Sequence, residues 1–436
     1  MGQNARMTAS NNYNRLALAA CFGTFIEWYD FLTFATLAVH FAVLFFPADD
    51  PVSGLLYSLA TFGVGMVVRP LGAALFGSLG DRLGRKHVFI ATIGIMGVAT
   101  FLVGFLPTFA QWGWWSAALL LTLRLVQGLA MGGEIGGANV YLAEHAPLAR
   151  RGAATSVLQW MGGLGILAST AQIVALQFWL SPEEFASWGW RVPFWLSAVL
   201  LLVSVKARLA LLESPVFENL KTLGQTSQSP LKDCFRDPIT RGRMMLLFFG
   251  VSAGGSVLFF SSQVYTSVYL KTVVLMNPVT VGWLSALSTL CLFPLTYVAG
   301  AASDRWGRRP VVMSGLFLGL LLILPVYAAL PLVAETWWLV FGLQLLLVVA
   351  VALVTGPQTA LLSELFSART RYTAVGLPHN LAAGWIGGLS PYVVNLLANQ
   401  TGVPLLGLIY PSALLLMAWW VCYVHLPETR GADLTL

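Results

Sequence analysis

Charged residues are scarce in this sequence. Asp, Glu, Lys and Arg together make up only 10% of its 436 residues, against about 25% in a typical soluble domain. Hydrophobic residues make up 57%, which is more apolar surface than a water-soluble chain of this length can bury. These proportions exclude a soluble globular protein and predict one whose solvent is lipid.

Cysteine and histidine are also sparse. The four cysteines form no Cys-x-x-Cys pair and have no histidine cluster beside them, so we interpret them as small core residues. The sequence therefore predicts no metal site and no cofactor. The five histidines are scattered along the chain. This argues against a membrane-embedded enzyme, which would need a catalytic cluster.

Basic residues are placed unevenly. Most of the 24 Lys and Arg residues fall between apolar runs, or at run ends, that share one side of the predicted membrane. The positive-inside rule assigns that side to the cytoplasm, together with both chain termini. Because no basic face exists outside these short loops, we expect membrane lipids and a small molecule as partners, and no nucleic acid.

Long apolar runs dominate the chain. Twelve of them reach the roughly 20 residues that a membrane span needs. They are expected at residues 17–46, 52–76, 87–106, 114–143, 153–179, 191–212, 243–270, 279–301, 310–331, 336–362, 372–399 and 404–426. The first follows a basic start, as a signal peptide does, but it is too long for one and contains Glu27 and Asp30, so we interpret it as an uncleaved helix.

A charged motif is repeated at half the chain length. Gly77–Lys86 recurs as Gly300–Arg309, 223 residues later, and Glu144–Arg151 recurs as Glu364–Arg371. Such repeats predict an all-α membrane protein whose twelve transmembrane helices form two pseudo-symmetric six-helix bundles. The bundles are expected at residues 1–212 and 243–436, joined by a polar cytoplasmic linker at 213–242.

The repeated motif resembles the loop motif of the major facilitator superfamily. Arg124–Gly128 and Pro427–Gly431 resemble two further motifs of that superfamily. Four local patterns resemble its metabolite:proton symporter branch: Glu27–Phe31, Arg69–Gly72, Gly132–Ala138 and Trp188–Pro193. The resemblance implies a carrier that imports small, often carboxylated, metabolites.

Each copy of the motif is expected to form a tight, glycine-rich turn that presents one aspartate to a helix N-terminus, which carries about half a positive charge. We expect Asp81 to meet the eleventh helix near Arg371, and Asp304 to meet the fifth helix near Arg151. These contacts would lock the cytoplasmic side while the carrier faces outward. The alternative is a plain solvated, positively charged loop. The predicted gating residues are Gly77, Asp81, Arg82, Arg85, Asp304, Arg308, Arg151 and Arg371.

Five ionisable residues fall inside predicted helices. They are Glu27, Asp30, Arg69, Arg124 and Glu134. Each costs at least about 2.5–3.5 kcal/mol in the bilayer and so implies a partner or a role. The rise of the α-helix puts Asp30 and Arg124 near mid-membrane and the other three at one level nearer the cytoplasm. The five carry one net negative charge, so one proton would neutralise them.

These charges suggest a coupling mechanism. Deprotonated Asp30 is expected to pair with Arg124, and its protonation would free the guanidinium to bind a substrate carboxylate through two hydrogen bonds. Resemblance to sugar carriers, which have an aspartate and an arginine at matching motif positions, supports this pair. The alternative is a static ion pair that holds the first and fourth helices together. The predicted proton-coupling residues are Asp30, Arg124, Glu27 and Glu134.

Other polar residues are expected to face a central cavity. The predicted substrate-binding residues are Arg124, Arg69, Tyr29, Gln159, Gln263, Tyr265, His379 and Asn380. A lone histidine in an apolar run is more often a packing residue, and this alternative stays open for His379. The row Gly128, Gly132 and Gly136 predicts close helix packing, since a phosphate cradle would need a soluble strand-turn-helix context.

The sequence thus predicts a monomeric, proton-coupled importer of a small organic acid in a bacterial-type inner membrane. Two alternatives remain. One is proton symport of a zwitterionic compatible solute such as proline or betaine. The other is efflux of amphipathic compounds by proton antiport.

Overall fold

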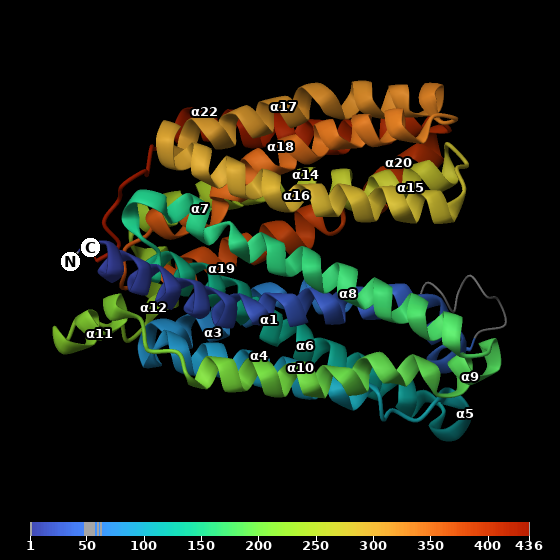
Figure 1. The fold of residues 1–436 in the computed structure, drawn as a ribbon, viewed down its shortest axis with the longest axis horizontal. Helices are drawn as coiled ribbons and strands as arrows, with labels where there is room; N and C mark the ends of the chain where they lie inside the picture. Colours follow the sequence, from blue (N-terminus) through green and yellow to red (C-terminus); the bar gives the residue numbers. More distant parts are fainter. Residues whose placement is uncertain (1, 48–56, 59–60, 62, 436) are drawn as a thin grey trace. The chain divides into compact units, whose positions relative to one another are not determined.

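The computed structural model describes residues 2–47, 57–58, 61 and 63–435 (Figure 1). All regular structure within these ranges is helical, with no strand, which confirms the predicted all-α class. Ten helical segments there are long and apolar enough to cross a membrane. They are Arg85–Val103, Trp114–His145, Leu148–Trp179, Gly189–Leu209, Pro238–Thr272, Pro278–Trp306, Arg308–Val333, Trp337–Glu364, Arg371–Thr401 and Pro404–His425.

These ten segments match the third to twelfth predicted spans. The first predicted span corresponds to α1 (Gly2–Phe45), which begins earlier than expected and ends one residue before the predicted end. The second predicted span, 52–76, includes residues outside the described ranges, and its last part belongs to α3 (Arg69–Leu83).

The described chain divides into two compact units. One contains the residues up to Tyr141 and Met161–Pro230, and the other contains Leu142–Trp160 and Leu231–Leu436. The predicted division assigned residues 142–160 to the first bundle, whereas in the structure α7 (Arg151–Thr155) packs against α16 and α18 of the second unit. Charged side chains on this segment explain the difference, because their partners lie in the second unit.

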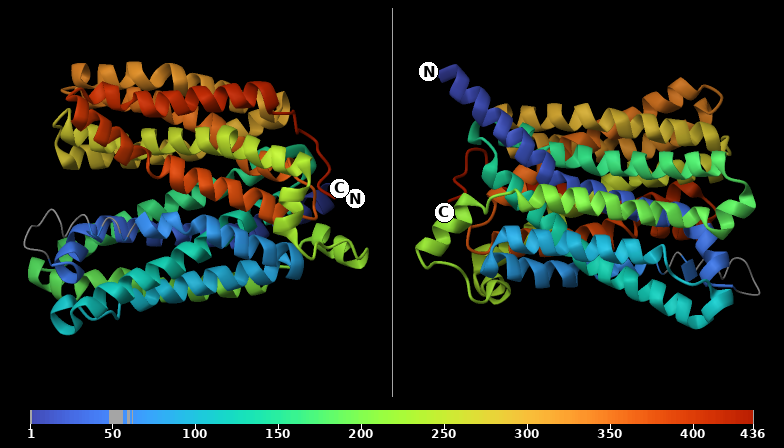
Figure 2. Two further views of the ribbon diagram at one scale, coloured as in Figure 1. Left: turned by 180° about the vertical axis from the view of Figure 1, so that it is seen from behind. Right: turned by 60° about the horizontal axis from the view of Figure 1, so that its bottom comes forward.

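The first unit is built from long antiparallel helices. They are α1, α3, α4 (Arg85–Val103), α6 (Trp114–His145), α8 (Val157–Trp179) and α10 (Val192–Leu209). α4 and α10 pack along one another (Figure 1, Figure 2). Short helices α5 (Phe109–Trp112) and α9 (Pro182–Ser187) occupy the loops at one end, and α11 (Pro215–Thr222) begins the linker.

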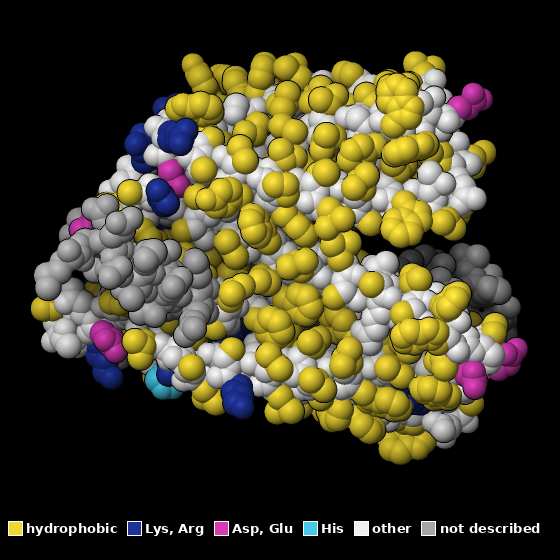
Figure 3. All heavy atoms as spheres, viewed as in Figure 1, with side chains coloured by type: hydrophobic (Ala, Val, Ile, Leu, Met, Phe, Trp, Pro, Cys, Tyr) yellow, Lys and Arg dark blue, Asp and Glu magenta, His cyan; other side chains and the backbone are white. Residues whose placement is uncertain are grey.

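The second unit has α16 (Pro278–Trp306), α17 (Arg308–Ala329), α18 (Trp337–Glu364) and α22 (Ile409–His425) as its longest helices. α18 packs against both α16 and α17. The remaining helices are α12 (Pro230–Arg236), α13 (Pro238–Leu246), α14 (Ala253–Phe259), α15 (Thr266–Thr272), α19 (Arg371–Leu381), α20 (Ser390–Thr401) and α21 (Pro404–Gly407). In Figure 3, Lys and Arg gather at one end of the unit drawn at the top, and apolar side chains cover most of its visible face. This surface suits a lipid environment.

Three π-helical segments interrupt the second unit. Residues 247–252 and 260–265 flank α14, and residues 382–387 follow α19. The wider turn of a π-helix leaves the regular hydrogen-bond ladder and is often found at functional sites. Predicted substrate residues Gln263 and Tyr265 lie in the second of these segments.

The charged motif is mostly helical, and its predicted glycine-rich turn is wrong in extent. α3 continues to Leu83, so the bend is confined to Gly84, whose φ is 116°. Gly307 takes the same role between α16 and α17, with φ 104°. Positive φ is costly for residues with a Cβ, which explains a glycine at both bends.

Candidate functional site

The predicted pair of Asp30 and Arg124 is present in the first unit. Asp30 on α1 is fully buried and Arg124 on α6 is 3% exposed. Arg124 Nη1 lies 3.5 Å from Asp30 Oδ2. The guanidinium also lies over the Phe34 ring, 3.5 Å from its centroid. Because charge-assisted hydrogen bonds are usually about 2.7–2.9 Å long, this is a loose ion pair.

Gln127 supports the carboxylate of this pair. Its Nε2 donates to Asp30 Oδ2 at 3.0 Å and to Thr100 Oγ1 at 2.8 Å. Sequence reasoning did not assign Gln127 to the site, although it lies three residues after Arg124 and therefore on the same side of α6.

The pair keeps unused hydrogen-bonding capacity. Asp30 Oδ1, Arg124 Nε and Arg124 Nη2 are buried and have no hydrogen-bond partner within the described part of the chain. An unsatisfied buried polar group costs about 1–3 kcal/mol, and more if it is charged. The arrangement is therefore able to accept a proton on the carboxylate and an anion on the guanidinium.

A second ion pair lies one helical turn away. Arg69 Nη2 on α3 lies 3.1 Å from Glu27 Oε1 on α1, and both side chains are buried. Glu27 Oε2 has no hydrogen-bond partner among the described residues. The structure thus joins Glu27 and Arg69, which the sequence placed at one level.

Glu134 has a partner that the sequence analysis did not anticipate. Its carboxylate forms an ion pair with Arg208 of α10, in which Arg208 Nη1 donates to Glu134 Oε2 at 2.9 Å and Nη2 contacts Oε1. Arg208 is completely buried. In the sequence, Arg208 lies near the cytoplasmic end of a predicted helix and was interpreted as one of the basic residues there. The signal for its buried position is Glu134, an intramembrane carboxylate for which the sequence analysis had found no cation.

The buried position of Arg208 changes the net charge of the intramembrane residues. With Arg208, the buried set contains three carboxylates and three guanidiniums, each carboxylate beside one guanidinium. The expected net negative charge is therefore wrong, and the set gives no proton number.

The Arg208–Glu134 pair joins four helices. Arg208 also donates to the carbonyls of Phe89 at 2.6 Å and Ala20 at 3.3 Å, and Thr92 donates to Glu134 at 3.2 Å. A Cβ atom at Gly23 would overlap this ion pair. These contacts on α1, α4, α6 and α10 favour a packing role for Glu134 over the predicted coupling role.

The second unit contains the expected contact of Asp304. Its Oδ1 and Oδ2 accept hydrogen bonds from the backbone N–H groups of Gly152 at 2.8 Å and Ala153 at 2.9 Å. The prediction that Asp304 meets the start of the fifth helix near Arg151 is confirmed. Arg308 holds the carboxylate at 2.7 Å, so the aspartate is fixed from both sides.

The arginine of each copy of the Glu-to-Arg repeat forms an ion pair with the glutamate of the other copy. Arg151 pairs with Glu364 at 2.9 Å, and Arg371 pairs with Glu144 at 2.6 Å. Arg308 adds a further bond to Glu364 at 3.1 Å. Sequence reasoning named the arginines as gating residues but not the glutamates, although the repeat contained both.

The segment after α22 forms hydrogen bonds with the residues of these ion pairs. Thr429 donates to Glu364 at 2.9 Å, Arg151 donates to the Ala432 carbonyl at 3.0 Å, and Arg371 donates to the Leu434 carbonyl at 2.9 Å. Residues 429–434 therefore bind both of the repeated arginines.

The remaining predicted gating residues lie in the first unit. Gly77 and Asp81 are buried and Arg82 is exposed. The backbone N–H of Arg85 donates to Glu213 at 3.2 Å, just as that of Arg308 donates to Glu428 at 2.8 Å in the second unit. The contact expected between Asp81 and the region of Arg371 stays a prediction.

Tyr29 and Gln159 were predicted to bind substrate. The Tyr29 hydroxyl instead lies 3.0 Å from the Pro193 carbonyl and also contacts the side chain of Gln172, and these contacts link α1 to α8 and α10. Gln159 is half-buried on α8. The Tyr29 contacts are those of a packing residue.

The other predicted substrate residues lie in the second unit. His379 Nδ1 is 3.0 Å from Ser252 Oγ, and Asn380 donates to the Gly376 carbonyl at 2.8 Å. Thr289 donates to Gln263 at 3.2 Å. Tyr265 is buried, with its ring centroid 5.6 Å from that of Tyr327. His379 thus has a polar partner, whereas Tyr265 is packed among aromatic rings.

Comparison with known proteins places these features in a family. The sequence profile of the sugar (and other) transporter family matches residues 16–231 and 217–436. The inner membrane metabolite transport protein YhjE of Escherichia coli K12 is 34% identical over 92% of this chain and 91% of its own. The shikimate transporter of the same organism is 36% identical over 87% and 86%. The proline/betaine transporter of Salmonella typhimurium is 31% identical over 88% and 77%.

A solved structure shares the fold. The major facilitator superfamily proton:xylose symporter XylE, bound to 6-bromo-6-deoxy-D-glucose, superposes with a TM-score of 0.81 at 16% identity, over 98% of each chain. Together the family match, the relatives and the apolar helices show a multi-pass membrane transporter of small molecules, not an enzyme. The chain belongs to the sugar (and other) transporter family and has the major facilitator fold.

Proposed function

We propose that the protein is a proton symporter that imports a small organic acid by alternating access. The observation that carries this proposal is the loose Asp30–Arg124 pair, which leaves one carboxylate oxygen and two guanidinium nitrogens without partners among the described residues. The mechanism needs no cofactor besides the proton.

Protonation of Asp30 removes the charge that holds Arg124. The guanidinium is then able to bind a carboxylate through two parallel hydrogen bonds, which its planar geometry favours. Proton and anion each favour binding of the other, and such reciprocal coupling is typically worth about 1–3 kcal/mol. One proton with one monoanion moves no net charge, so the pH gradient and the substrate gradient would drive uptake.

The relatives support the proposal at a coarser level. Their names include a shikimate transporter and proline/betaine transporters, and XylE is named a proton:xylose symporter. A buried guanidinium with free donors favours a carboxylate. A zwitterionic solute is the second candidate, because the proline/betaine transporters are 31% identical and a zwitterion also presents a carboxylate.

We further propose that the protein acts as a monomer in a bacterial-type inner membrane, with both termini in the cytoplasm. The clustering of Lys and Arg at one end of the second unit supports this orientation (Figure 3). Labelling of single cysteines at residues 8 and 433 from either side of the membrane tests it.

A ligand panel tests the substrate class. Thermal unfolding of the purified protein is measured with mono-, di- and tricarboxylates, aromatic acids, betaines and neutral sugars. We expect a carboxylate to raise the midpoint, and Arg124→Lys to weaken its binding by about tenfold or more, since lysine lacks the two-pronged geometry.

Arg208→Lys is the matched control, because Arg208 is another buried guanidinium beside a carboxylate and its contacts favour a packing role. Stabilisation by neutral sugars alone, or equal carboxylate affinity in Arg124→Lys and the wild type, would contradict the proposed anion site.

A further inference from the structure

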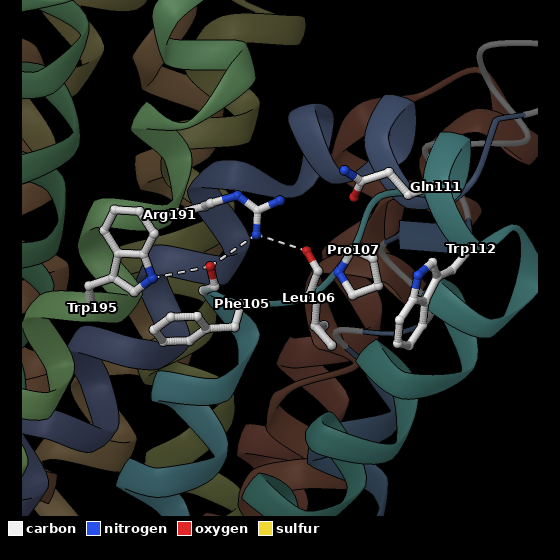
Figure 4. Close-up of a pocket in the computed structure, with 8 residues that line it drawn as sticks. Phe105, Leu106, Pro107, Gln111, Trp112, Arg191 and Trp195 are labelled. Carbon is white, nitrogen blue, oxygen red and sulfur yellow. Dashed lines mark hydrogen bonds between the residues drawn. The ribbon is translucent and has the colours of Figure 1, made fainter.

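Arg191 lies beside a cleft that the transport mechanism does not use. The cleft has a volume of about 520 Å³ and lies between the end of α4, the short helix α5 and the start of α10, all in the first unit (Figure 4). Gln111, Trp112 and Trp195 line it together with Arg191. This end of α4 is remote from the charged motif, which places the cleft on the predicted outer side of the membrane.

The guanidinium of Arg191 is only partly engaged. Its Nη1 donates to the carbonyls of Gly104 at 2.9 Å and Leu106 at 2.8 Å, and its face lies on the Trp190 ring, 4.3 Å from the centroid. In Figure 4 the other terminal nitrogen points away from these carbonyls, toward the side on which Gln111 lies. A guanidinium has five N–H donors. No described residue accepts a hydrogen bond from Nε or Nη2, so these donors are available to a ligand.

Arg191 has no acidic partner among the residues that the structure describes. Within the described part of the chain, the ion pairs do not include Arg191. The nearby Glu184 instead accepts from the backbone of Ser181 at 2.9 Å, in the cap of α9. The two carbonyls position the side chain without neutralising it, which leaves a fixed cation that attracts an anion.

An apolar surface continues from the cleft. Phe105 and Trp112 at its rim are each 59% exposed. α4 and α10 pack along one another. Along their length away from the cleft, both helices expose a series of apolar side chains. These are Ile95, Val98 and Leu102 on α4, and Leu196, Val199, Leu202 and Val203 on α10. A fixed cation above an apolar face, with tryptophans at the same level, is an arrangement suited to the membrane interface.

We propose that Arg191 binds the phosphate group of a phospholipid headgroup through Nε and Nη2. The acyl chains of that lipid lie on the exposed faces of α4 and α10. Arginine suits this ligand because its planar donors match two phosphate oxygens and the hydrogen bonds are charge-assisted. Free phosphate has the same anionic chemistry but would leave the apolar face uncovered. The site is independent of the proposed transport function.

Native mass spectrometry of the full chain in detergent, titrated with phosphatidylglycerol, tests this site. We expect one tightly retained lipid in the wild type, and a loss of affinity of about tenfold or more in Arg191→Gln and in Trp112→Glu. Trp112→Glu places a carboxylate in the cleft while leaving the bonds from Arg191 to Gly104 and Leu106 in place. It therefore keeps the test valid if Arg191→Gln does not fold.

Two control variants distinguish the effect of the added negative charge from the effects of losing the Trp112 ring and of adding a charge elsewhere. Trp112→Gln removes the same ring without adding charge, and Trp115→Glu adds the same charge at a residue that is 74% exposed and outside the cleft. Both are expected to retain the lipid. Equal retention by all five proteins would overturn the site. Displacement of the lipid by low millimolar inorganic phosphate would overturn the lipid assignment and identify a small-anion site.

Discussion

At the residue scale, the contribution of the Arg208–Glu134 pair depends on which atoms are removed. Arg208→Gln leaves the Glu134 carboxylate buried without its cation, and removing one partner of a buried pair typically costs about 3–5 kcal/mol. The double variant Glu134→Leu, Arg208→Met replaces both charges with apolar groups, which is often close to neutral. Thermal unfolding in detergent measures both variants.

We expect Arg208→Gln to be strongly destabilised, and the double variant to unfold near the wild-type temperature and to retain proton-driven uptake. A double variant that is stable and binds substrate but loses proton coupling would show that Glu134 takes part in coupling after all.

Individual buried charges were predictable only where the sequence isolates them. Asp30 and Arg124 lie deep inside apolar runs at matching depths, so their pairing followed from helix geometry. Arg208 lies near Lys206 at the end of a helix, a position that predicts an exposed cation beside a loop. In the structure it is completely buried. That Asp30 Oδ1 has no hydrogen-bond partner among the described residues was not predictable, because it depends on side-chain directions in three helices.

At the scale of elements, glycines determine how closely α3 and α6 approach. A Cβ atom at Gly132 would overlap the backbone carbonyl of Arg69, and one at Gly72 would come within 2.7 Å of the carbonyl carbon of Leu129. The predicted close packing is therefore confirmed for Gly132. We expect Gly132→Ala to push the two helices apart and to cost about 1–3 kcal/mol.

Gly94→Ala provides the control, because nothing lies within 4 Å of a Cβ atom at Gly94 on α4. There the substitution should be neutral or stabilising by about 0.5–1 kcal/mol, since alanine favours the helix. Equal unfolding temperatures for the two variants would contradict the packing account.

The positions of the third to twelfth helices were predictable to within about five residues because apolar length reports them directly, whereas α1 begins at Gly2 and not at residue 17. The π-helical segments at 247–252, 260–265 and 382–387 were not predictable, since a single wider turn hardly changes the hydrophobic pattern. The charged motif was predicted as a turn because glycine and charge usually end a helix, whereas α3 extends to Leu83.

At the scale of the whole molecule, the exchanged pairs Arg151–Glu364 and Arg371–Glu144 are expected to hold the cytoplasmic side closed. Glu364→Gln and Glu144→Gln each remove one of the charges. We expect both to increase the labelling rate of a single cysteine on the cytoplasmic side of the transport path. Glu335→Gln, at an exposed residue, is the control; rates in all three variants equal to the wild-type rate would argue against the lock.

The repeats made the two-bundle architecture predictable, because a motif that returns after half the chain leaves a direct mark in the sequence. The path of residues 429–434 was not predictable. Arg151 and Arg371 bind the carbonyls of Ala432 and Leu434 there, and backbone acceptors carry no sequence signal. The same limit applies to Arg191, whose Nη1 partners are both carbonyls.

Coupling at Asp30 is tested most directly in proteoliposomes that contain the wild type or Asp30→Asn. Substrate uptake against its gradient under an imposed pH gradient is compared with exchange at equal substrate concentrations. Because asparagine cannot take up or release the proton, we expect Asp30→Asn to retain exchange and to lose uphill uptake. Undiminished uphill uptake by Asp30→Asn would contradict the coupling role of the Asp30–Arg124 pair.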